Sequence, residues 1–366
     1  MPEGFNPTRL TLARKRRGFT KGELARLIGV DLRSITAYEA GEYPPSEDTL
    51  ARISSASALE FPTDFFYGDD LEEPKADAAS FRAMSRMTAS QRDMALGEGA
   101  LALHLNNWLE RRFELPKVDL PHLGRERSPE AAAETLRRRW GIGELPINNM
   151  VHLLEAKGVR IFSLDVDTRE VDAFSMWREV TPFVFLNSYK SSEHSRFDAA
   201  HELGHLVLHR HGGPHGRAAE KEADAFASAF LMPRASVLAH APRFVTWNGL
   251  IKLKKIWSTS VAALNYRLHA LGLTTDWQYR GMCIEISSRG RDKEPDECQH
   301  ETSQILNKVL ASLHDDGITR GHIAKELGLA VAELNRMIFG LVMTGIEGGR
   351  RTTSAPSSAQ LVLVKK

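Results

Sequence analysis

Residues 201–205 read His-Glu-Leu-Gly-His, within the run AAHELGHLVLH at 199–209. Residues four apart share one face of a helix, so His201 and His205 can present two imidazoles to one metal ion. Glu202 lies on the adjacent surface, where it can accept a proton from an attacking water molecule. The rest of the run is almost entirely apolar, whereas two histidines on a surface helix would have polar neighbours. The pattern therefore predicts a hydrolytic zinc site.

A catalytic zinc site needs a third protein ligand, and the run EKEADAFASAFLMP follows at 220–233. Positions 220, 223, 224 and 227 share one face of a helix that can pack on the first through small residues. Glu220 is the expected third ligand, and Asp224, one turn further on, is expected to hydrogen-bond a ligating histidine. The competing third ligands are Glu222, His209, His211 and His215.

These two motifs together resemble the ImmA/IrrE-type metallopeptidases over roughly residues 130–270. The resemblance implies Zn²⁺ on His201, His205 and Glu220, with Glu202 as the general base. It also implies cleavage of a repressor or antitoxin-like protein in response to stress or a mobile-element signal. In such hydrolysis zinc polarises the scissile carbonyl and makes water more acidic, while the base passes the proton to the leaving amine.

The peptide-binding surface is less well defined by the sequence. Pro182, at the start of the apolar run 183–186, favours an edge strand to which an extended peptide could add across the metal. A buried core strand is the equal alternative. Tyr266 and His269 are available as donors to an oxyanion, and Cys298 is expected to be a free cysteine rather than a zinc ligand.

A second motif covers residues 5–60. Thr20 and Glu23 form the expected capping box of a helix that ends at Gly29, a residue that tolerates the left-handed turn. Asp31 can then cap a second helix. The inward-facing positions of the two helices are expected to be Leu24, Ala25, Leu27, Ile35 and Tyr38. This order, with the exit YEAG at 38–41, resembles the Xre/Cro-type helix-turn-helix domain, so the chain as a whole resembles an Xre-ImmA/IrrE fusion regulator.

That resemblance implies that the chain binds double-stranded operator DNA as a homodimer, with the recognition helix at 32–39. The DNA-facing residues of this helix would be Arg33, Ser34, Thr36 and Ala37, while Lys21 and the basic run 14–17 would contact phosphates. Residues 1–60 carry nine Lys/Arg and eight Asp/Glu, which is far from a strongly basic domain. A domain that docks a protein partner is therefore the alternative.

The motif recurs near the C-terminus. TKGELARLIGV at 20–30 and TRGHIAKELGL at 319–329 share the threonine, both glycines and the alanine in register. The second copy predicts either another DNA reader or plain helical packing.

The length of 366 residues predicts two or three domains, and 42% hydrophobic residues exclude wholesale disorder. We expect an α+β protein: an all-α helix-turn-helix domain at 1–70, a helical connector at 71–128, a zincin-like peptidase domain with a small sheet at 129–275, and a helical region with a loose tail at 276–366. Two cysteines, no apolar signal segment at the start and no long apolar run predict a cytoplasmic protein without contact to membranes.

Within that plan, β-rich runs at 159–162, 171–174 and 183–186 predict the sheet, and residues 76–128 predict two amphipathic helices. The charged run RGRDKEPDE at 289–297 predicts a linker, and Lys252, Lys254 and Lys255 predict a solvated basic face. Two functional alternatives remain. One is a transcription factor whose metal domain senses a ligand without cleavage, and the other is a peptidase whose helix-turn-helix only docks the substrate.

Overall fold

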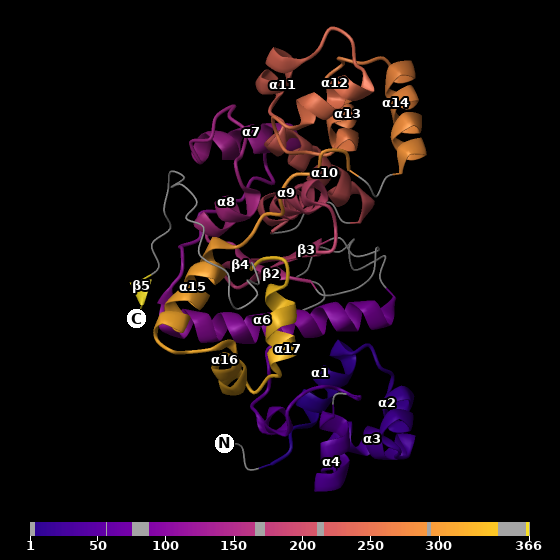
Figure 1. The fold of residues 1–366 in the computed structure, drawn as a ribbon, viewed down its shortest axis with the longest axis vertical. Coiled ribbons are helices and arrows are strands. Elements are labelled where there is room, and N and C mark those ends of the chain that lie inside the picture. Colours follow the sequence, from indigo (N-terminus) through magenta and orange to yellow (C-terminus); the bar gives the residue numbers. More distant parts are fainter. Residues whose placement is uncertain are drawn as a thin grey trace.

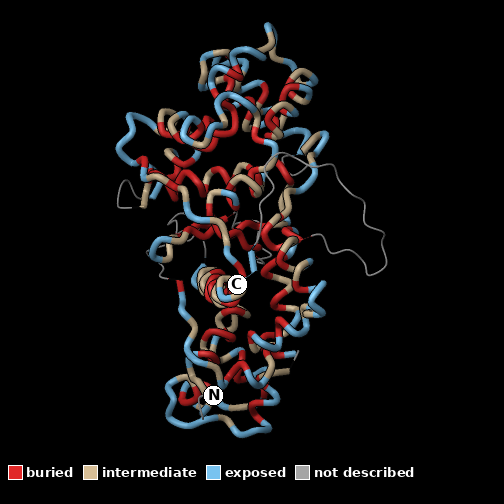
Figure 2. The backbone as a smooth tube through the Cα atoms, turned by 90° about the vertical axis from the view of Figure 1, so that its left-hand side faces the viewer, coloured by how far each residue is buried: buried red, intermediate tan, exposed pale blue. Residues whose placement is uncertain are grey.

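The computed structural model describes residues 4–55, 57–74, 88–164, 173–210, 216–290, 294–342 and 364–365. The molecule is elongated, with the N-terminal helices at one end and the helices of residues 234–289 at the other (Figures 1 and 2). Helices surround a three-stranded sheet, and a second sheet consists of two short strands, so the expected α+β class is confirmed. Within the described parts of the chain, no helix combines the length and the apolar content needed to cross a membrane.

The N-terminal end is helical throughout. Its elements are α1 (Pro7–Arg16), α2 (Lys21–Ile28), α3 (Leu32–Ala40), α4 (Glu47–Ser54) and the 3₁₀ helix η1 (Thr63–Tyr67). The capping box of Thr20 and Glu23 is present, and Gly29 ends α2 in the left-handed region at φ 70°. Asp31 stands at the N-cap of α3 without a side-chain hydrogen bond. The expected inward position of Leu27 is wrong, because Leu27 is 47% exposed and Ile28 is buried instead.

One long helix crosses the middle of the molecule. Helix α6 (Ala89–Arg112) begins at a capping box of Thr88 and Gln91 and is buried on most sides. In Figure 1 it lies between the N-terminal helices and the sheet. It corresponds to the second helix expected in 76–128, whereas the first falls largely on 75–87, outside the described residues. The short strand β1 (Phe113–Glu114) follows it and pairs with β5 (Val364–Lys365).

The sheet consists of β2 (Arg160–Ser163), β3 (Ala173–Arg178) and β4 (Thr181–Leu186), in the order β2-β4-β3. Strand β4 runs parallel to β2 and antiparallel to β3. Of the two alternatives for this run, the buried core strand is therefore confirmed and the edge strand is wrong: β4 is the central strand, and β3 is an edge. Pro182 is tolerated because it stands near the start of the strand, opposite Trp177, where a missing N–H costs little.

Eight helices of the middle region pack over this sheet and beyond it. They are α7 (Pro129–Arg139), α8 (Met150–Ala156), α9 (Ser192–Leu208), α10 (Arg217–Leu231), α11 (Arg234–His240), α12 (Trp247–Lys254), α13 (Val261–Ala270) and α14 (Asp276–Arg289). Helix α9 packs on α10 and on β3, and α10 also packs on α7. The two motif helices are therefore neighbours next to the edge strand.

The segment expected as a linker is anchored where it is described. Glu294 accepts a hydrogen bond from the Val261 N–H at 2.9 Å, and Glu297 accepts one from the Ser192 N–H at 3.0 Å. Lys254 pairs with Glu294 at 3.1 Å and with Glu193 at 2.6 Å. Lys254 is fully buried, so the expected solvated face is wrong for this residue. The sequence around Lys254 did not indicate this burial, because both of its carboxylate partners lie in segments far from it in sequence.

The C-terminal region contains α15 (Gln304–Asp315), α16 (Arg320–Leu327) and α17 (Val331–Ile338). Thr319 caps α16 in a capping box with His322, and Gly328 ends α16 in the left-handed region at φ 66°. The same two features start and end α2, as the recurring sequence pattern predicts. Of the expected loose tail from 345, the structure describes Val364 and Lys365 alone.

Candidate metal centre

The two motif helices approach closely at a glycine. A β-carbon placed on Gly204 would lie 3.2 Å from the Cα of Ala223 and 3.1 Å from Cδ1 of Phe226. Ala223 and Ala227 are fully buried on the facing side of α10. Small residues on both helices therefore let α9 and α10 lie near enough for a short carboxylate side chain to reach the histidines.

Three side chains converge where the helices meet. Oε2 of Glu220 lies 3.3 Å from Nε2 of His201, and Oε1 lies 3.3 Å from Nε2 of His205. The two Nε2 atoms are 3.1 Å apart. Among the described residues, these three form the one group of histidine, cysteine and carboxylate side chains close enough to share a metal ion.

These separations fit a tetrahedral zinc ion. Ligand atoms about 2.0–2.1 Å from such an ion lie about 3.3–3.4 Å from one another, close to the 3.1–3.3 Å found here. Two imidazoles and one carboxylate also match the donor set of catalytic zinc sites, which keep a fourth position open. Zinc fits the residues present.

Electrostatics at the group favour a cation. Burial acts to lower the pKa of His201, but hydrogen bonds to Asp224 and Glu220 and the nearby Glu202 raise it to about 10. Burial acts to raise the pKa of Glu220, but hydrogen bonds from His201 and His205 lower it to about 2. The surrounding carboxylates thus create a negative potential at the point where the three ligand atoms meet.

The Nδ1 atom of each ligating histidine also has a hydrogen-bond partner. Oδ1 of Asp224 lies 2.9 Å from Nδ1 of His201, as expected for a residue one turn beyond Glu220. On the other side, Nδ1 of His205 lies 3.0 Å from Nδ1 of His209, whose Nε2 lies 3.1 Å from Glu222. Because their Nδ1 atoms are engaged, both histidines keep Nε2 free for a metal.

This geometry separates the competing ligands. His209 and Glu222 form a relay behind His205 and do not join the group of three. Burial lowers the pKa of His209, although Glu222 acts in the opposite direction. A neutral His209 can accept a hydrogen bond at Nδ1 from the Nδ1–H of His205 and donate its Nε2–H to Glu222. His211 and His215 lie outside the described residues.

Glu202 faces the sheet side of the site. Its Oε2 accepts a hydrogen bond of 2.6 Å from the hydroxyl of Ser175 on β3, and Glu202 is 3% exposed. Sequence reasoning missed Ser175. The sequence did contain an indication of this contact, because one hydroxyl stands among apolar residues in the buried part of the strand, where a polar group needs a partner.

The other residues considered for chemistry lie elsewhere. His269 contacts Asp276 at 3.4 Å and stacks on Tyr279, at the junction of α13 and α14. Tyr266, on the same helix, is 46% exposed. Cys298 has a thiol outside any disulfide, and its N–H donates to Glu193 at 3.0 Å. We find no oxyanion donor among them.

The expected DNA-facing residues fall into two groups. Arg33 and Thr36 are exposed on α3, Ser34 is partly exposed, and the Thr36 hydroxyl donates to the Leu32 carbonyl at 3.0 Å. Ala37 is 6% exposed, so its expected place in the groove is wrong. A methyl group is too short to extend beyond the longer side chains around it. Lys21 is partly exposed, with its Nζ 3.3 Å from Glu39.

The basic run 14–17 is largely used inside the protein. Arg14 binds Glu39 through two nitrogens, at 2.6 and 3.0 Å. Arg16 is 2% exposed and lies 3.3 Å from Glu333, and Arg17 also pairs with Glu333. The expectation that these three arginines contact phosphates is therefore wrong, because acidic side chains of the protein already occupy them.

Comparison with known proteins agrees with both motifs. Residues 154–269 match the model of the peptidase family described as the IrrE N-terminal-like domain. Residues 10–56 match a family model described as helix-turn-helix. No curated protein matches the chain.

Proposed function

For a chain that joins a helix-turn-helix domain to an IrrE-type peptidase domain, we propose a DNA-binding regulator that cleaves a protein partner with a zinc centre. The observation that carries this proposal is the convergence of His201, His205 and Glu220 beside a buried Glu202. In our proposal the domains are 1–70 for DNA, 71–128 as connector, 129–275 for cleavage and 276–366 as the C-terminal region. The partner is a repressor or antitoxin-like protein, cut in response to stress or a mobile-element signal.

The chemistry of peptide cleavage follows from the positions of the side chains. When bound, the zinc ion supplies Lewis acidity that polarises the scissile carbonyl. Oε1 of Glu202 accepts the proton of the attacking water, while the Ser175 hydroxyl holds Oε2 and fixes the orientation of the carboxylate. The protonated Glu202 then returns the proton to the leaving amine. Asp224 and the His209–Glu222 pair keep the imidazoles in the orientation that presents Nε2.

Strand β3 suggests how a peptide would lie. No strand of the described residues pairs with its outer edge, and Ser175 on the same strand reaches Glu202. An extended substrate can add to such an edge through its backbone and so pass the metal centre. In our proposal the substrate therefore adds to β3, and not to the run 183–186 that the sequence offered as one possible edge strand.

The DNA-binding part of the proposal rests on α3. Arg33, Ser34 and Thr36 would read bases in the major groove, and Lys21 would contact a phosphate. Such domains bind inverted repeats in pairs, so we propose a homodimer on its operator, acting in the cytoplasm.

Replacing the base tests cleavage separately from metal binding. Glu202→Gln keeps size and helix propensity, and it should retain zinc and DNA binding while cleavage of the partner falls by about 10²–10⁴-fold. The measurement is the partner's band on a gel, alongside the zinc content per chain. His201→Ala is the companion variant, which should lose the zinc itself.

Two results would replace the proposal. Equal regulation by wild type and Glu202→Gln would make the metal domain a sensor without turnover. Absence of sequence preference for DNA in the full chain, with cleavage intact, would make the N-terminal domain a docking module for the substrate.

A further inference from the structure

The second copy of the helix-turn-helix motif uses its recognition face inside the protein. Counted from the capping threonines Thr20 and Thr319, Glu333 on α17 stands where Ser34 stands on α3, and Arg336 stands where Ala37 stands. In a DNA reader this part of the second helix enters the major groove. Here Glu333 is 0% exposed, so it cannot face a groove.

Glu333 instead contacts the end of α1 in the N-terminal domain. One carboxylate oxygen lies 3.3 Å from Nε of Arg16, and the other pairs with Arg17. Arg16 also lies 3.6 Å from Glu98 on α6, which is fully buried. Two guanidinium groups and two carboxylates are thus removed from water together, which is tolerable only when they remain paired.

Arg336 extends the same contact at its rim. Its guanidinium lies 2.5 Å from Glu333 and 2.8 Å from Glu60, which follows α4 in the N-terminal domain. Arg17 approaches the same Glu60 at 3.5 Å and donates to the Leu59 carbonyl at 2.7 Å. Glu333, which corresponds to the partly exposed Ser34, and Arg336, on the next turn of α17, therefore both bind the N-terminal domain.

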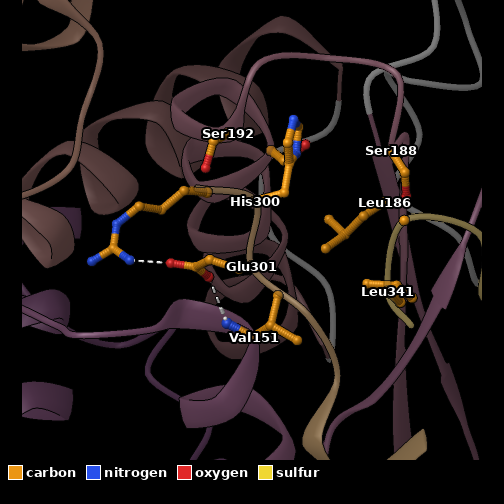
Figure 3. Close-up of a pocket in the computed structure, with 10 residues that line it drawn as sticks. Val151, Leu186, Ser188, Ser192, His300, Glu301 and Leu341 are labelled. Carbon is orange, nitrogen blue, oxygen red and sulfur yellow. Dashed lines mark hydrogen bonds and ion pairs between the residues drawn. The ribbon is translucent and has the colours of Figure 1, made fainter. Parts of the chain in front are cut away.

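The other end of the helix pair is fixed to the peptidase side. The Ser188 hydroxyl, between β4 and α9, donates to the Phe339 carbonyl at 2.9 Å, and Tyr189 stacks on Phe339 with ring centres 5.0 Å apart. Figure 3 shows Leu341 beside Leu186 and Ser188 at this point. Gly340 has φ 70°, and a β-carbon there would lie 2.5 Å from Cβ of Ser188, so the approach requires glycine.

Helix α16 adds a third attachment, on α6. The Trp108 Nε1–H donates to Glu326 at 2.9 Å, and Arg112 pairs with the same carboxylate. His104 contacts the carbonyl of Leu327 at 3.1 Å. The pair α16–α17 thus lies between the central helix, the loop before the metal helix and the N-terminal domain (Figure 1).

We infer that α16–α17 is an intramolecular receptor for the N-terminal domain and does not read DNA. Its occupant is the basic end of α1, and charge complementarity between Glu333 and the arginines selects it. The contact leaves Arg33 exposed on α3, so the N-terminal domain is attached to the peptidase domain while its recognition helix remains accessible to DNA. Only this last clause rests on the proposed function.

The test is hydrogen–deuterium exchange on the full-length chain in the absence of DNA. Glu333→Arg places like charges together and should speed exchange of the α1 amides about 10-fold or more, because breaking a buried ion pair is strongly destabilising. Exchange in α9 and α10 should stay unchanged. Glu134→Arg, a charge reversal at an exposed position of α7, is the matched control and should change nothing.

A charge swap guards against general misfolding. Arg17→Glu combined with Glu333→Arg restores one of the opposite-charge pairs, while Arg16 still faces the new arginine, so part of the slow exchange in α1 should return. Slow α1 exchange in a folded Glu333→Arg chain would overturn the inference.

A separate measurement addresses DNA. Asn335→Ala on α17 should leave the affinity of the full chain for a mixed-sequence duplex unchanged, whereas Lys21→Ala should lower it. Loss of affinity in Asn335→Ala would make the second motif a DNA reader and overturn the inference. If no variant and no wild-type chain binds DNA, the proposed function fails while the docking result stands by itself.

Discussion

Gly204 of α9 faces Ala223 of α10 across a contact in which even a β-carbon would be tighter than ordinary packing. A β-carbon on residue 204 would lie 3.2 Å from the Cα of Ala223, and the atom it meets belongs to the backbone, which cannot turn away. The three ligand side chains lie on either side of this contact, on the same two helices. The spacing of the helices, and not only the identity of the ligands, therefore determines whether Glu220 reaches both histidines.

Gly204→Val should push the two helices apart. We expect the free energy of unfolding to fall by about 1–3 kcal/mol, as for other overpacked cores, together with weaker zinc binding. Chemical denaturation and competition with a chelator measure the two effects. Gly281→Val on the exposed side of α14 is the matched control, because a β-carbon there meets nothing within 4 Å. Equal losses in both variants would show that helix propensity, and not the contact, is responsible.

His209, which contacts Nδ1 of His205, should contribute to zinc affinity as much as Asp224, which contacts Nδ1 of His201. His209→Ala removes the partner of His205 Nδ1, and Asp224→Ala removes the partner of His201 Nδ1. Each change should weaken zinc binding about 10–100-fold, because the freed imidazole can rotate. Titration with a fluorescent zinc chelator gives the affinity. If His209→Ala binds zinc as tightly as the wild type, the relay contributes to packing alone.

The motif made the ligands predictable because their spacing is local. His201 and His205 are four residues apart, so a helix alone brings them together. Ser175 and Glu202 meet across 27 residues, and Arg17 and Glu333 across 316, and no pattern within one segment specifies such pairs. Taken alone, the basic run at 14–17 therefore predicts contacts to phosphates, although in the fold acidic side chains bind most of its residues.

Contacts to DNA should divide into two kinds. Arg33→Ala should weaken binding to a specific operator by about 1–3 kcal/mol and relax the preference for one base pair. Lys21→Ala should weaken binding to all sequences alike and reduce the salt dependence by about one ion. Affinities are measured over a series of salt concentrations. Arg26→Ala, at an exposed position of α2, is the control. Equal salt slopes in Lys21→Ala and wild type would remove Lys21 from the phosphate contacts.

Acid should release the N-terminal domain from α17. Burial acts to raise the pKa of Glu333, but Arg16, Arg17 and Arg336 lower it to about 2. A carboxyl group whose pKa is lowered on folding stabilises the fold above its ordinary pKa of about 4.5, and this contribution is lost as the pH falls toward 2. Exchange of the α1 amides, corrected for the intrinsic pH dependence, should therefore speed up between these values. Glu333→Gln should abolish this pH dependence, and its persistence in that variant would assign it to other groups.

The segment that follows α14, anchored through Glu294 and Glu297, affects the order in which the chain acquires its structure. Glu301, just before α15, accepts hydrogen bonds from the first two N–H groups of α8, and Glu155 on α8 accepts them from the N-terminus of α15, about 150 residues away in sequence. During synthesis on the ribosome, these hydrogen bonds cannot form until residues 301–305 have emerged. The segment 154–269 that matches the peptidase family ends before these residues. A nascent chain paused at 269 would therefore hold the complete metal motif while α8 still lacked its contacts to Glu301.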